Sequence, residues 1–410
     1  MINNHKNIFL ILIFLCSAGF IFFRYALIPK YLAVDEVEFT KLALSLEGKP
    51  YTPYSTLATG HSTLYFYLLL LSLKLFGISP FALRFVSAIS GILCGLLFFG
   101  ILQLIFKNKH ISFLGSFVLI TSRWFINFAR FSFEPTFLLF LELSGIYFLL
   151  RYLRDKKIYE LIISSIFAGL VYNSYTPGRI FFFLSLFFLI YIFRQKKYFL
   201  KVILYFLLPF LIIVTPLQTY LFTHEDIRVN QLFFPSNPRL SIQQKTDFFT
   251  QNITKTVGMF IAKGDHNGKH NYPYKPALNP LLGIFSIAGL LIAIKSLYEF
   301  KNVFFLGYLI ISLIPTLLVY PWENPSMLRT YTVLPSIAYF SILPFITVIR
   351  SKFSKKTLLL FTMLVLIVMS TLYELRTYFF YQADVFNQSF EIKKPLQYVI
   401  NCPNVIECKD

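Results

Sequence analysis

The sequence predicts an all-α polytopic membrane protein with about eleven transmembrane helices. The composition is 56% hydrophobic and 14% charged, and the mean hydropathy is +0.65. A soluble globular domain has ~45–50% apolar and ~25% charged residues. Long apolar runs recur along the chain, and basic residues gather in alternate connections between them. These observations exclude a soluble globular protein.

The formal net charge of +19 would suggest a nucleic-acid partner in a soluble protein. Here the basic residues fall mostly in short loops between apolar runs. That distribution follows from the positive-inside rule and from attraction to anionic lipid headgroups. We therefore expect the lipid bilayer, and no nucleic acid, as a partner.

Crossing a bilayer as a helix takes ~20 apolar residues. The first run is too long for a typical signal-peptide core and lacks a clear small-residue cleavage site, so it is interpreted as a retained span. The eleven predicted spans are residues 7–28, 81–106, 111–129, 132–154, 158–175, 179–194, 198–222, 279–298, 302–320, 328–349 and 356–379.

A twelfth apolar stretch, residues 61–76, is short, contains Lys74 and is bounded by two glycines. If it does not cross, the N-terminus and the basic clusters share the inner face, and single arginines remain in the short outer turns. We therefore interpret 61–76 as an interfacial helix on the outer surface.

The predicted organisation is one transmembrane domain, residues 1–379, with large outer segments at 29–80 and 223–278. Residues 35–47 have the spacing of an amphipathic helix lying on the membrane. Residues 380–410 form a short external tail, in which Cys402 and Cys408 can form a disulfide if the compartment is oxidising.

Acidic residues at the outer ends of spans are the first candidates for chemistry. Asp35 and Glu36 follow the first span, and Glu134 follows Arg130 by four residues at the start of another. Acids at a helix start also complement its dipole, and an Arg-Glu pair at this spacing is a common helical ion pair. The functional interpretation is a general base or metal ligand at Asp35, with a second acid nearby.

Four single arginines occupy predicted outer positions, where the positive-inside rule disfavours them. Each can instead bind lipid headgroups or a local acid. Several at one depth favour a phosphate site, because the arginine fork binds phosphate in a bidentate manner. The four are Arg84, Arg130, Arg179 and Arg329.

The segment 264–271 is dense in polar groups and is either a turn-rich loop or a set of substrate contacts. No CxxC or Cys/His spacing typical of a metal site occurs, so the cofactor stays unknown, with a divalent cation as one option. The candidate donor or acceptor contacts are His61, Asp265, His266, Asn267 and His270.

Several motifs in residues 35–135 resemble those of a known family. They are the Asp-Glu pair after the first span, an amphipathic helix, an aromatic-rich interfacial helix, LFGISPFALR at 75–84 and RFSFE at 130–134. Together they resemble the GT-C membrane glycosyltransferases of the glycosyltransferase family 39 type, which include protein O-mannosyltransferases and the lipid A aminoarabinose transferase. The stretch GDHNGKHNYPYKPALNPLLG at 264–283 is similar to a segment of prokaryotic members.

There are also departures from the family pattern. Relatives often have His-Pro-Pro before the interfacial helix, where this chain has Gly60-His61-Ser62-Thr63. The chain also lacks a large C-terminal soluble domain, so a protein acceptor cannot be assumed.

The resemblance implies inverting transfer of a hexose or pentose from a polyprenyl-phosphate donor in the outer leaflet to a lipid, glycan or protein acceptor. Asp35 would match the family's catalytic acid and act as general base, with Glu36 and Glu134 positioning acceptor or sugar. Arg84, helped by Arg130, Arg179 or Arg329, would hold the departing phosphate. The expected location is a prokaryotic plasma membrane, with the site facing outside.

Two other functions remain open at this stage. A lipid-linked sugar flippase or another transporter would need ionisable groups near the membrane midplane. A polysaccharide polymerase or ligase would share the donor class but not the Asp-Glu position. For the transferase, we expect Asp35, Glu134 and Arg84 to converge on one outward-facing cavity.

Overall fold

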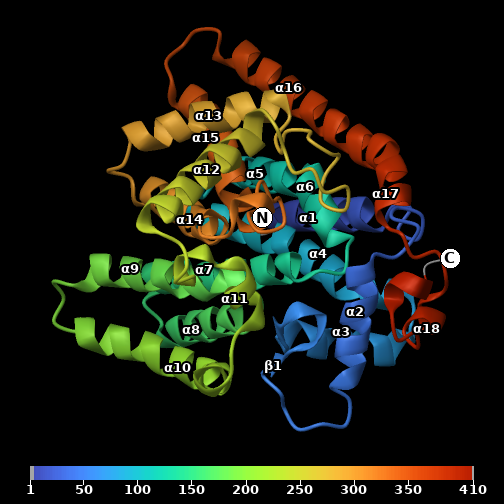
Figure 1. The fold of residues 1–410 in the computed structure, drawn as a ribbon. Coiled ribbons are helices and arrows are strands. Elements are labelled where there is room, and N and C mark those ends of the chain that lie inside the picture. The colour runs from blue at the N-terminus through green and yellow to red at the C-terminus, as the bar shows by residue number, and fades with distance from the viewer. Residues whose placement is uncertain (1–3, 409–410) are drawn as a thin grey trace.

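The computed structural model describes residues 4–408 and is predominantly helical, with side chains described from Ile8 onward (Figure 1). Two short strands, β1 (Tyr54–Ser55) and β2 (His61–Ser62), form a small antiparallel hairpin. The helices are α1 (Asn4–Phe22), α2 (Val34–Ser45), α3 (Leu64–Phe76), α4 (Pro80–Phe106), α5 (Lys109–Thr121), α6 (Arg123–Ala129), α7 (Glu134–Asp155), α8 (Ile158–Tyr172), α9 (Phe181–Phe193), α10 (Phe199–Thr223), α11 (Ile227–Leu232), α12 (Ile242–Ile261), α13 (Pro280–Lys295), α14 (Phe300–Leu317), α15 (Leu334–Arg350), α16 (Lys356–Arg376), α17 (Ala383–Ser389) and α18 (Leu396–Val399).

Short helical turns complete the chain between these helices. They are the 3₁₀ turns η1 (Leu57–Thr59), η2 (Thr176–Ile180), η3 (Phe234–Ser236), η4 (Pro321–Glu323), η5 (Tyr331–Val333) and η7 (Val405–Cys408), and the π-helical turn η6 (Thr377–Gln382).

The apolar helices confirm an all-α polytopic membrane protein. Within residues 4–408, seven helical segments are long and apolar enough to cross a membrane, and the bent pair α5–α6 makes up to eight. The shorter apolar helices α1, α8 and α13 coincide with three further predicted spans, while α3 falls in the stretch expected to be interfacial. The count of eleven remains a prediction.

Several spans begin at the residues that favour a helix start. The Ser79 side chain accepts a hydrogen bond from the Ala82 amide, and Pro80 follows in the first turn of α4. Asn279 caps α13 in the same way, with Pro280 next. A capping oxygen satisfies an amide that lacks a helical partner, and proline needs no partner at this position.

Close approach between helices depends on small residues. Gly289 of α13 packs so tightly on α15 that a Cβ atom there would lie 1.8 Å from the carbonyl oxygen of Phe340. By contrast, a Cβ atom at Gly283, two turns earlier on α13, would meet nothing within 4 Å. Small residues of this kind let membrane helices approach backbone to backbone.

The predicted span 111–129 is broken rather than straight. Helices α5 and α6 meet at an angle of 64°, and Ser122 between them has extended backbone angles. The Arg123 amide donates to Oε2 of Glu374 at 3.0 Å. The guanidinium of Arg123 donates to Asn271 and to the Pro276 carbonyl. The break thus turns a buried arginine toward the second outer segment.

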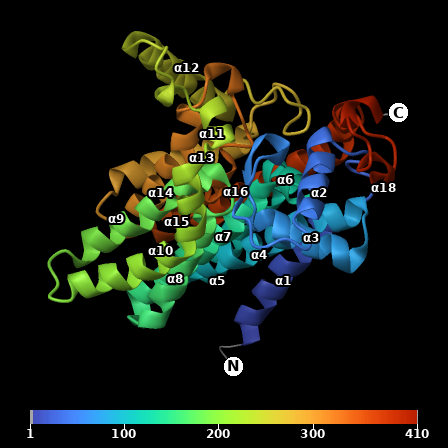
Figure 2. The same ribbon diagram turned by 60° about the horizontal axis from the view of Figure 1, so that its bottom comes forward.

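The two outer segments and the tail lie at the end of the molecule opposite the N-terminal end of α1, as Figure 2 shows. Leu32 and Ile392 exchange two backbone hydrogen bonds of 3.1 and 2.9 Å. Lys41 of α2 donates to the Cys402 carbonyl at 2.5 Å, and Cys402 forms a disulfide with Cys408. The tail therefore packs back onto the first outer segment.

Helix α2 lies where an amphipathic surface helix is predicted, but it is more enclosed than that prediction implies. Val37, Leu42 and Ala43 are fully buried. The helix contacts α3, η1 and η7 of the tail. This enclosure fixes the backbone that carries the Asp-Glu pair.

Candidate functional site

Asp35 lies in the first turn of α2, at the edge of the outer surface. Its carboxylate pairs with the Lys269 ammonium, and the two side chains are 37% and 22% exposed. The helix dipole favours a negative charge at this position. Burial and the charge of Asp35 raise the pKa of neighbouring Glu38 above its usual range. Asp35 is thus a partly accessible acid in contact with one cation.

Glu36 has a different environment, because its side chain is fully buried. Its two oxygens accept from Nε and Nη2 of Arg84 at 2.7 and 2.8 Å. The remaining contacts of Arg84 are to the Pro29 and Tyr31 carbonyls, both at 2.7 Å. Since every guanidinium nitrogen of Arg84 donates to a protein oxygen, these contacts favour a structural role over the predicted phosphate contact.

Arg130 is also fully buried. Its guanidinium donates to the carbonyls of Ile21 and Phe23 at 2.6 Å and of Ile28 at 2.8 Å. These carbonyls belong to the end of α1 and the turn after it, where helical acceptors lack partners. Arg130 therefore caps α1, and its contacts differ from those predicted for a phosphate ligand.

Glu134, at the start of α7, contacts His61 of the first outer segment. Its Oε1 lies 2.8 Å from Nδ1 of His61, and its Oε2 is buried without a hydrogen-bond partner among the described residues. On the other side of the imidazole, Nη1 of Arg228 lies 2.8 Å from Nε2 of His61. The glutamate, histidine and arginine thus form a chain that joins α7, β2 and α11.

Arg228 connects this chain to Asp35. Burial lowers the pKa of Arg228, but Tyr175, Glu134 and Asp35 raise it above its ordinary value. Its guanidinium also lies 5.5 Å from the centre of the Tyr175 ring. One cation therefore interacts with both acids of the site.

Arg179 approaches from the turn between α8 and α9. Its Nη1 donates to Oδ2 of Asp226 at 2.5 Å, while its Nε and Nη2 are buried and have no hydrogen-bond partner among the described residues. Asp226 also accepts from the Tyr54 hydroxyl at 3.2 Å. Burial and the charge of Asp226 raise the pKa of Tyr54 to about 12.

Arg179, Arg228 and Arg329 line one cavity of about 200 Å³. The Arg329 guanidinium is held by Glu323, through its carbonyl oxygen at 2.9 Å and its carboxylate at 2.5 Å. The rest of the wall is mostly apolar and comes from η2, α11 and α14, including Ile180, Leu232, Phe233, Ile314 and Leu318. The cavity thus combines three guanidinium groups with an apolar wall.

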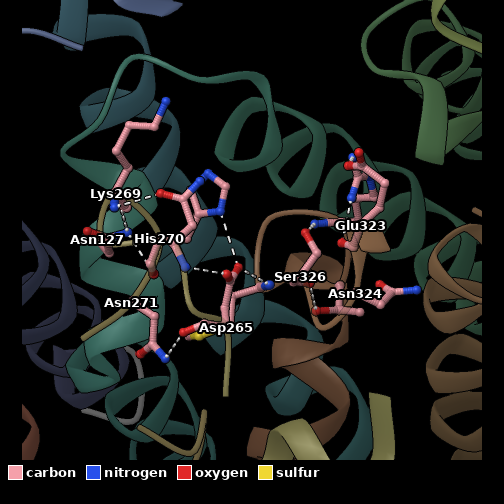
Figure 3. Close-up of polar contacts among 12 residues, drawn as sticks. Asn127, Asp265, Lys269, His270, Asn271, Glu323, Asn324 and Ser326 are labelled. Carbon is pink, nitrogen blue, oxygen red and sulfur yellow. Dashed lines mark hydrogen bonds and ion pairs between the residues drawn. The ribbon is translucent and has the colours of Figure 1, made fainter. Parts of the chain in front are cut away.

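The segment 264–271 is a compact loop, shown in Figure 3. Asp265 is buried and accepts from the Asn267 amide at 2.8 Å, the Met327 amide at 2.9 Å and His270 Nδ1 at 3.2 Å. Burial raises the pKa of Asp265, but these hydrogen bonds lower it overall. Asp265, Asn267 and His270 therefore shape the loop, and Lys269 is the residue that reaches Asp35.

The side chain of Asn127, on α6, holds the same loop through hydrogen bonds. Its Nδ2 donates to the carbonyls of Lys269 at 2.9 Å and His270 at 3.1 Å. Asn271 donates to the Asp265 and Lys275 carbonyls at 3.0 and 2.7 Å. His266 does not take part in these hydrogen bonds, and its ring is stacked against that of Tyr274.

The structure thus brings together part of the predicted set. Glu134 and His61 are in contact, and Asp35 lies close enough to interact with Arg228. Arg179 and Arg329 share a cavity, whereas Arg84 pairs with Glu36. Arg228 and Lys269 were not predicted. The described residues contain no group of three or more His, Cys, Asp or Glu side chains suited to a metal ion, and the metal requirement stays open.

Fold and site together define an integral multi-pass membrane protein with a polar, arginine-rich site at one end of its helical bundle. Comparison with solved structures places this fold among the GT-C membrane enzymes. The archaeal oligosaccharyltransferase AglB from Archaeoglobus fulgidus, in complex with an inhibitory peptide and a dolichol-phosphate, aligns with a TM-score of 0.58 and 14% identity. The alignment covers 98% of this chain and 59% of that enzyme, so this chain spans less than two thirds of its length.

A second similar structure is ArnT from Cupriavidus metallidurans bound to undecaprenyl phosphate. It aligns with a TM-score of 0.58 and 11% identity, over 95% of this chain and 78% of ArnT. Residues 60–220 match the family model described as dolichyl-phosphate-mannose-protein mannosyltransferase. No match was found among curated proteins. The GT-C fold and the predicted resemblance are thereby confirmed.

Proposed function

We propose that this protein is a glycosyltransferase that moves a sugar from a polyprenyl-phosphate donor to an acceptor hydroxyl on the non-cytoplasmic face of the membrane. The cavity of Arg179, Arg228 and Arg329 carries the proposal. Arg179 pairs with Asp226 through Nη1, but its buried Nε and Nη2 have no hydrogen-bond partner among the described residues, and a buried donor without a partner is costly. A phosphate would satisfy them, and the apolar wall suits the first part of a prenyl chain.

The acceptor end of the reaction is assigned to Asp35. Its carboxylate takes the proton of the acceptor hydroxyl as the acceptor oxygen attacks the anomeric carbon in line. The bond from that carbon to the phosphate oxygen breaks at the same time. Inversion follows because the nucleophile enters opposite the leaving group. Asp35 suits this role because its carboxylate lies at a helix start and is partly open to the surface.

The leaving-group end is assigned to the arginines. As the bond breaks, negative charge grows on the lipid phosphate, and Arg228 and Arg179 stabilise it more strongly than in the bound donor. Glu134 holds His61 and, through it, orients Arg228. In this scheme, Glu134 and His61 are positioning residues. Glu36 and Arg84 maintain the backbone before α2.

The first test is Asp35→Asn. The variant should insert and fold normally, because the amide keeps the size of the side chain, and transfer should fall by about 10²–10⁴-fold. Membranes containing the variant would be assayed with a panel of radiolabelled polyprenyl-phosphate sugars. Glu47→Gln, at the far end of the same segment and half-exposed, is the matched control and should retain activity. Full activity of Asp35→Asn would remove Asp35 from the mechanism.

The second test concerns the phosphate cavity. Arg179→Gln should weaken binding of undecaprenyl phosphate by about tenfold to a hundredfold, since a hydrogen bond to a charged group contributes ~1.5–3 kcal/mol. Native mass spectrometry of the purified protein in nanodiscs would measure this binding. Arg239→Gln, on an exposed part of the same outer segment, should bind like the unmodified protein. Equal affinity of both variants would contradict the assignment.

The transporter alternative receives less support. Its requirement is an ionisable group near the midplane that faces a pathway. Glu142 is a buried acid inside α7, but it accepts a hydrogen bond of 2.6 Å from the Tyr308 hydroxyl. It therefore has a local partner, while the unpaired arginine nitrogens lie at the outer end.

A further inference from the structure

A second cavity, of about 480 Å³, lies beside the loop that carries Lys269. Its wall combines α12, the two ends of the loop 264–275 and the turn at Asn324 and Pro325. It has no lining residue in common with the arginine cavity. The two cavities are therefore separate sites at the outer end of the molecule.

The lining of this second cavity is basic and aromatic. Lys255, Lys263 and His266 contribute to it, and no acidic residue is among the described lining residues. Lys263 Nζ lies 4.9 Å from the centre of the Tyr274 ring. The His266 ring also stacks against the Tyr274 ring, and the two ring centres are 6.4 Å apart. Tyr274 is 56% exposed, so much of its apolar surface is available.

The two lysines are not equivalent. Lys255 Nζ donates to the Pro321 carbonyl at 2.6 Å, which holds this side chain against the wall. Lys263 is exposed and lies over the aromatic ring. Apart from this ring contact, the Lys263 ammonium has no hydrogen bond or ion pair among the described residues, and an ammonium beside an aromatic platform matches a ligand with a single negative charge and an apolar ring face. A sugar ring with one carboxylate has both features.

The cavity has a rigid side and an open side. A Cβ atom at Gly264 would lie 1.9 Å from the Lys275 carbonyl oxygen, so the loop backbone is closely packed there. A Cβ atom at Gly258 would meet nothing within 4 Å. A larger side chain at Gly258 can therefore enter the cavity without displacing the helix that carries it.

The cavity also lies near the proposed acceptor end of the reaction. His266 lines it, and Lys269, three residues later, touches Asp35. Three residues of extended chain span at most ~11 Å. An oligosaccharide with one hydroxyl at Asp35 can therefore extend toward the cavity that Tyr274 lines.

We propose that this cavity binds a uronic acid unit, a sugar ring with one carboxylate, in the acceptor glycan. Lys263 pairs with the carboxylate, while Tyr274 and His266 cover a face of the ring. The role as acceptor subsite rests on the proposed function, but the binding of the anionic sugar does not. It can be measured with no donor present.

The experiment measures binding of a hyaluronan tetrasaccharide, which contains glucuronic acid, to the purified protein in phosphatidylcholine nanodiscs by isothermal titration calorimetry. Chitotetraose is the neutral comparison probe. The unmodified protein should bind the anionic probe at least about tenfold more tightly, which is ~1.4 kcal/mol. Lys263→Gln should remove that preference. Gly258→Phe should abolish binding of either probe by filling the cavity.

The control variant is Lys197→Gln, which removes a lysine from an exposed connection at the opposite end of the bundle and should bind like the unmodified protein. Equal binding of the two probes, or undiminished binding by Gly258→Phe, would overturn the proposal. So would a result in which only phosphatidylglycerol, added to the nanodiscs, binds in a Lys263-dependent manner, because the site would then be a lipid headgroup site.

The measurement also separates this proposal from the general function. The binding assay contains no donor, and the cavity is lined by residues other than Asp35, so probe binding does not depend on transfer. If the protein binds the probe but transfers no sugar, the binding of an anionic sugar stands, while the transferase proposal and the role as acceptor subsite fail. If transfer proceeds and neither Gly258→Phe nor Lys263→Gln affects probe binding, the subsite fails alone.

Discussion

At the scale of single residues, the proposed chemistry depends on two cations that come from the second outer segment. Arg228 lies 2.8 Å from His61 and interacts electrostatically with Asp35, and Lys269 pairs directly with Asp35. Both come from residues 223–278, which are separated from Asp35 by six predicted spans. The site is therefore assembled from parts of the chain that are distant in sequence.

Lys269 gives the sharpest prediction at this scale. Lys269→Met should reduce kcat by about tenfold to a hundredfold, because a hydrogen bond to a charged group contributes ~1.5–3 kcal/mol. Lys269→Arg should restore most of it, since the charge returns. Steady-state kinetics with a fixed donor would separate kcat from KM. A purely structural lysine would instead lower the melting temperature of the methionine variant without this rescue of kcat.

Sequence reasoning reached the acids more readily than their partners. Asp35 and Glu134 stand at helix starts after apolar runs, so the pattern places them both at one end of the helical bundle. Lys269 was not predicted as a site residue, because the surrounding Asp and His residues are the more usual catalytic types. Arg228 lies in a long polar segment, where one arginine has no local signal. The phosphate contact predicted for Arg84 could not be refined from the sequence, because its partners are carbonyls and a carboxylate that only the fold brings together.

At the scale of elements, helix starts and apolar runs were predicted well because their signals are local. The break between α5 and α6 was not, because the run 111–129 contains no proline or glycine near Ser122. Its cause is long-range, since Arg123 turns inward to meet Asn271, Pro276 and Glu374. Helix α12 was missed within a segment that is polar overall.

The contact between α13 and α15 can be tested with matched substitutions in one helix. Gly289→Ala should destabilise the protein by about 1–3 kcal/mol or more, because the added methyl group meets the Phe340 carbonyl. Gly283→Ala should be neutral or slightly stabilising, since alanine favours helix and the space there is open. Thermal unfolding in detergent would compare them. Equal melting temperatures would contradict the close approach.

At the scale of the whole molecule, the GT-C fold followed from hydropathy, charge alternation and the motifs of residues 35–135. The span count could not be fixed in this way. Helices α1, α8 and α13 are short for a full crossing, and whether they cross depends on their neighbours and on the local bilayer. Hydropathy does not contain that information.

Topology makes a direct prediction for the intact cell. A cysteine introduced at Glu47 should react with a membrane-impermeant maleimide added to whole cells, because this position belongs to the proposed outer face. A cysteine at Lys197 should react only after permeabilisation. Both native side chains are exposed, so access within the protein is similar. Labelling of Lys197→Cys in intact cells would reverse the proposed orientation.

The backbone pairing of Leu32 with Ile392 has a consequence for the order in which the protein folds during synthesis. A ribosome completes Leu32 when most of the membrane helices do not yet exist, and its backbone partner emerges some 360 residues later. Helix α2, which carries Asp35 and Glu36, therefore stays incompletely enclosed until the last helices have been made and the tail has packed against it. An immature chain would lack an ordered site, so under the proposed function transfer would begin only after the tail has packed onto α2.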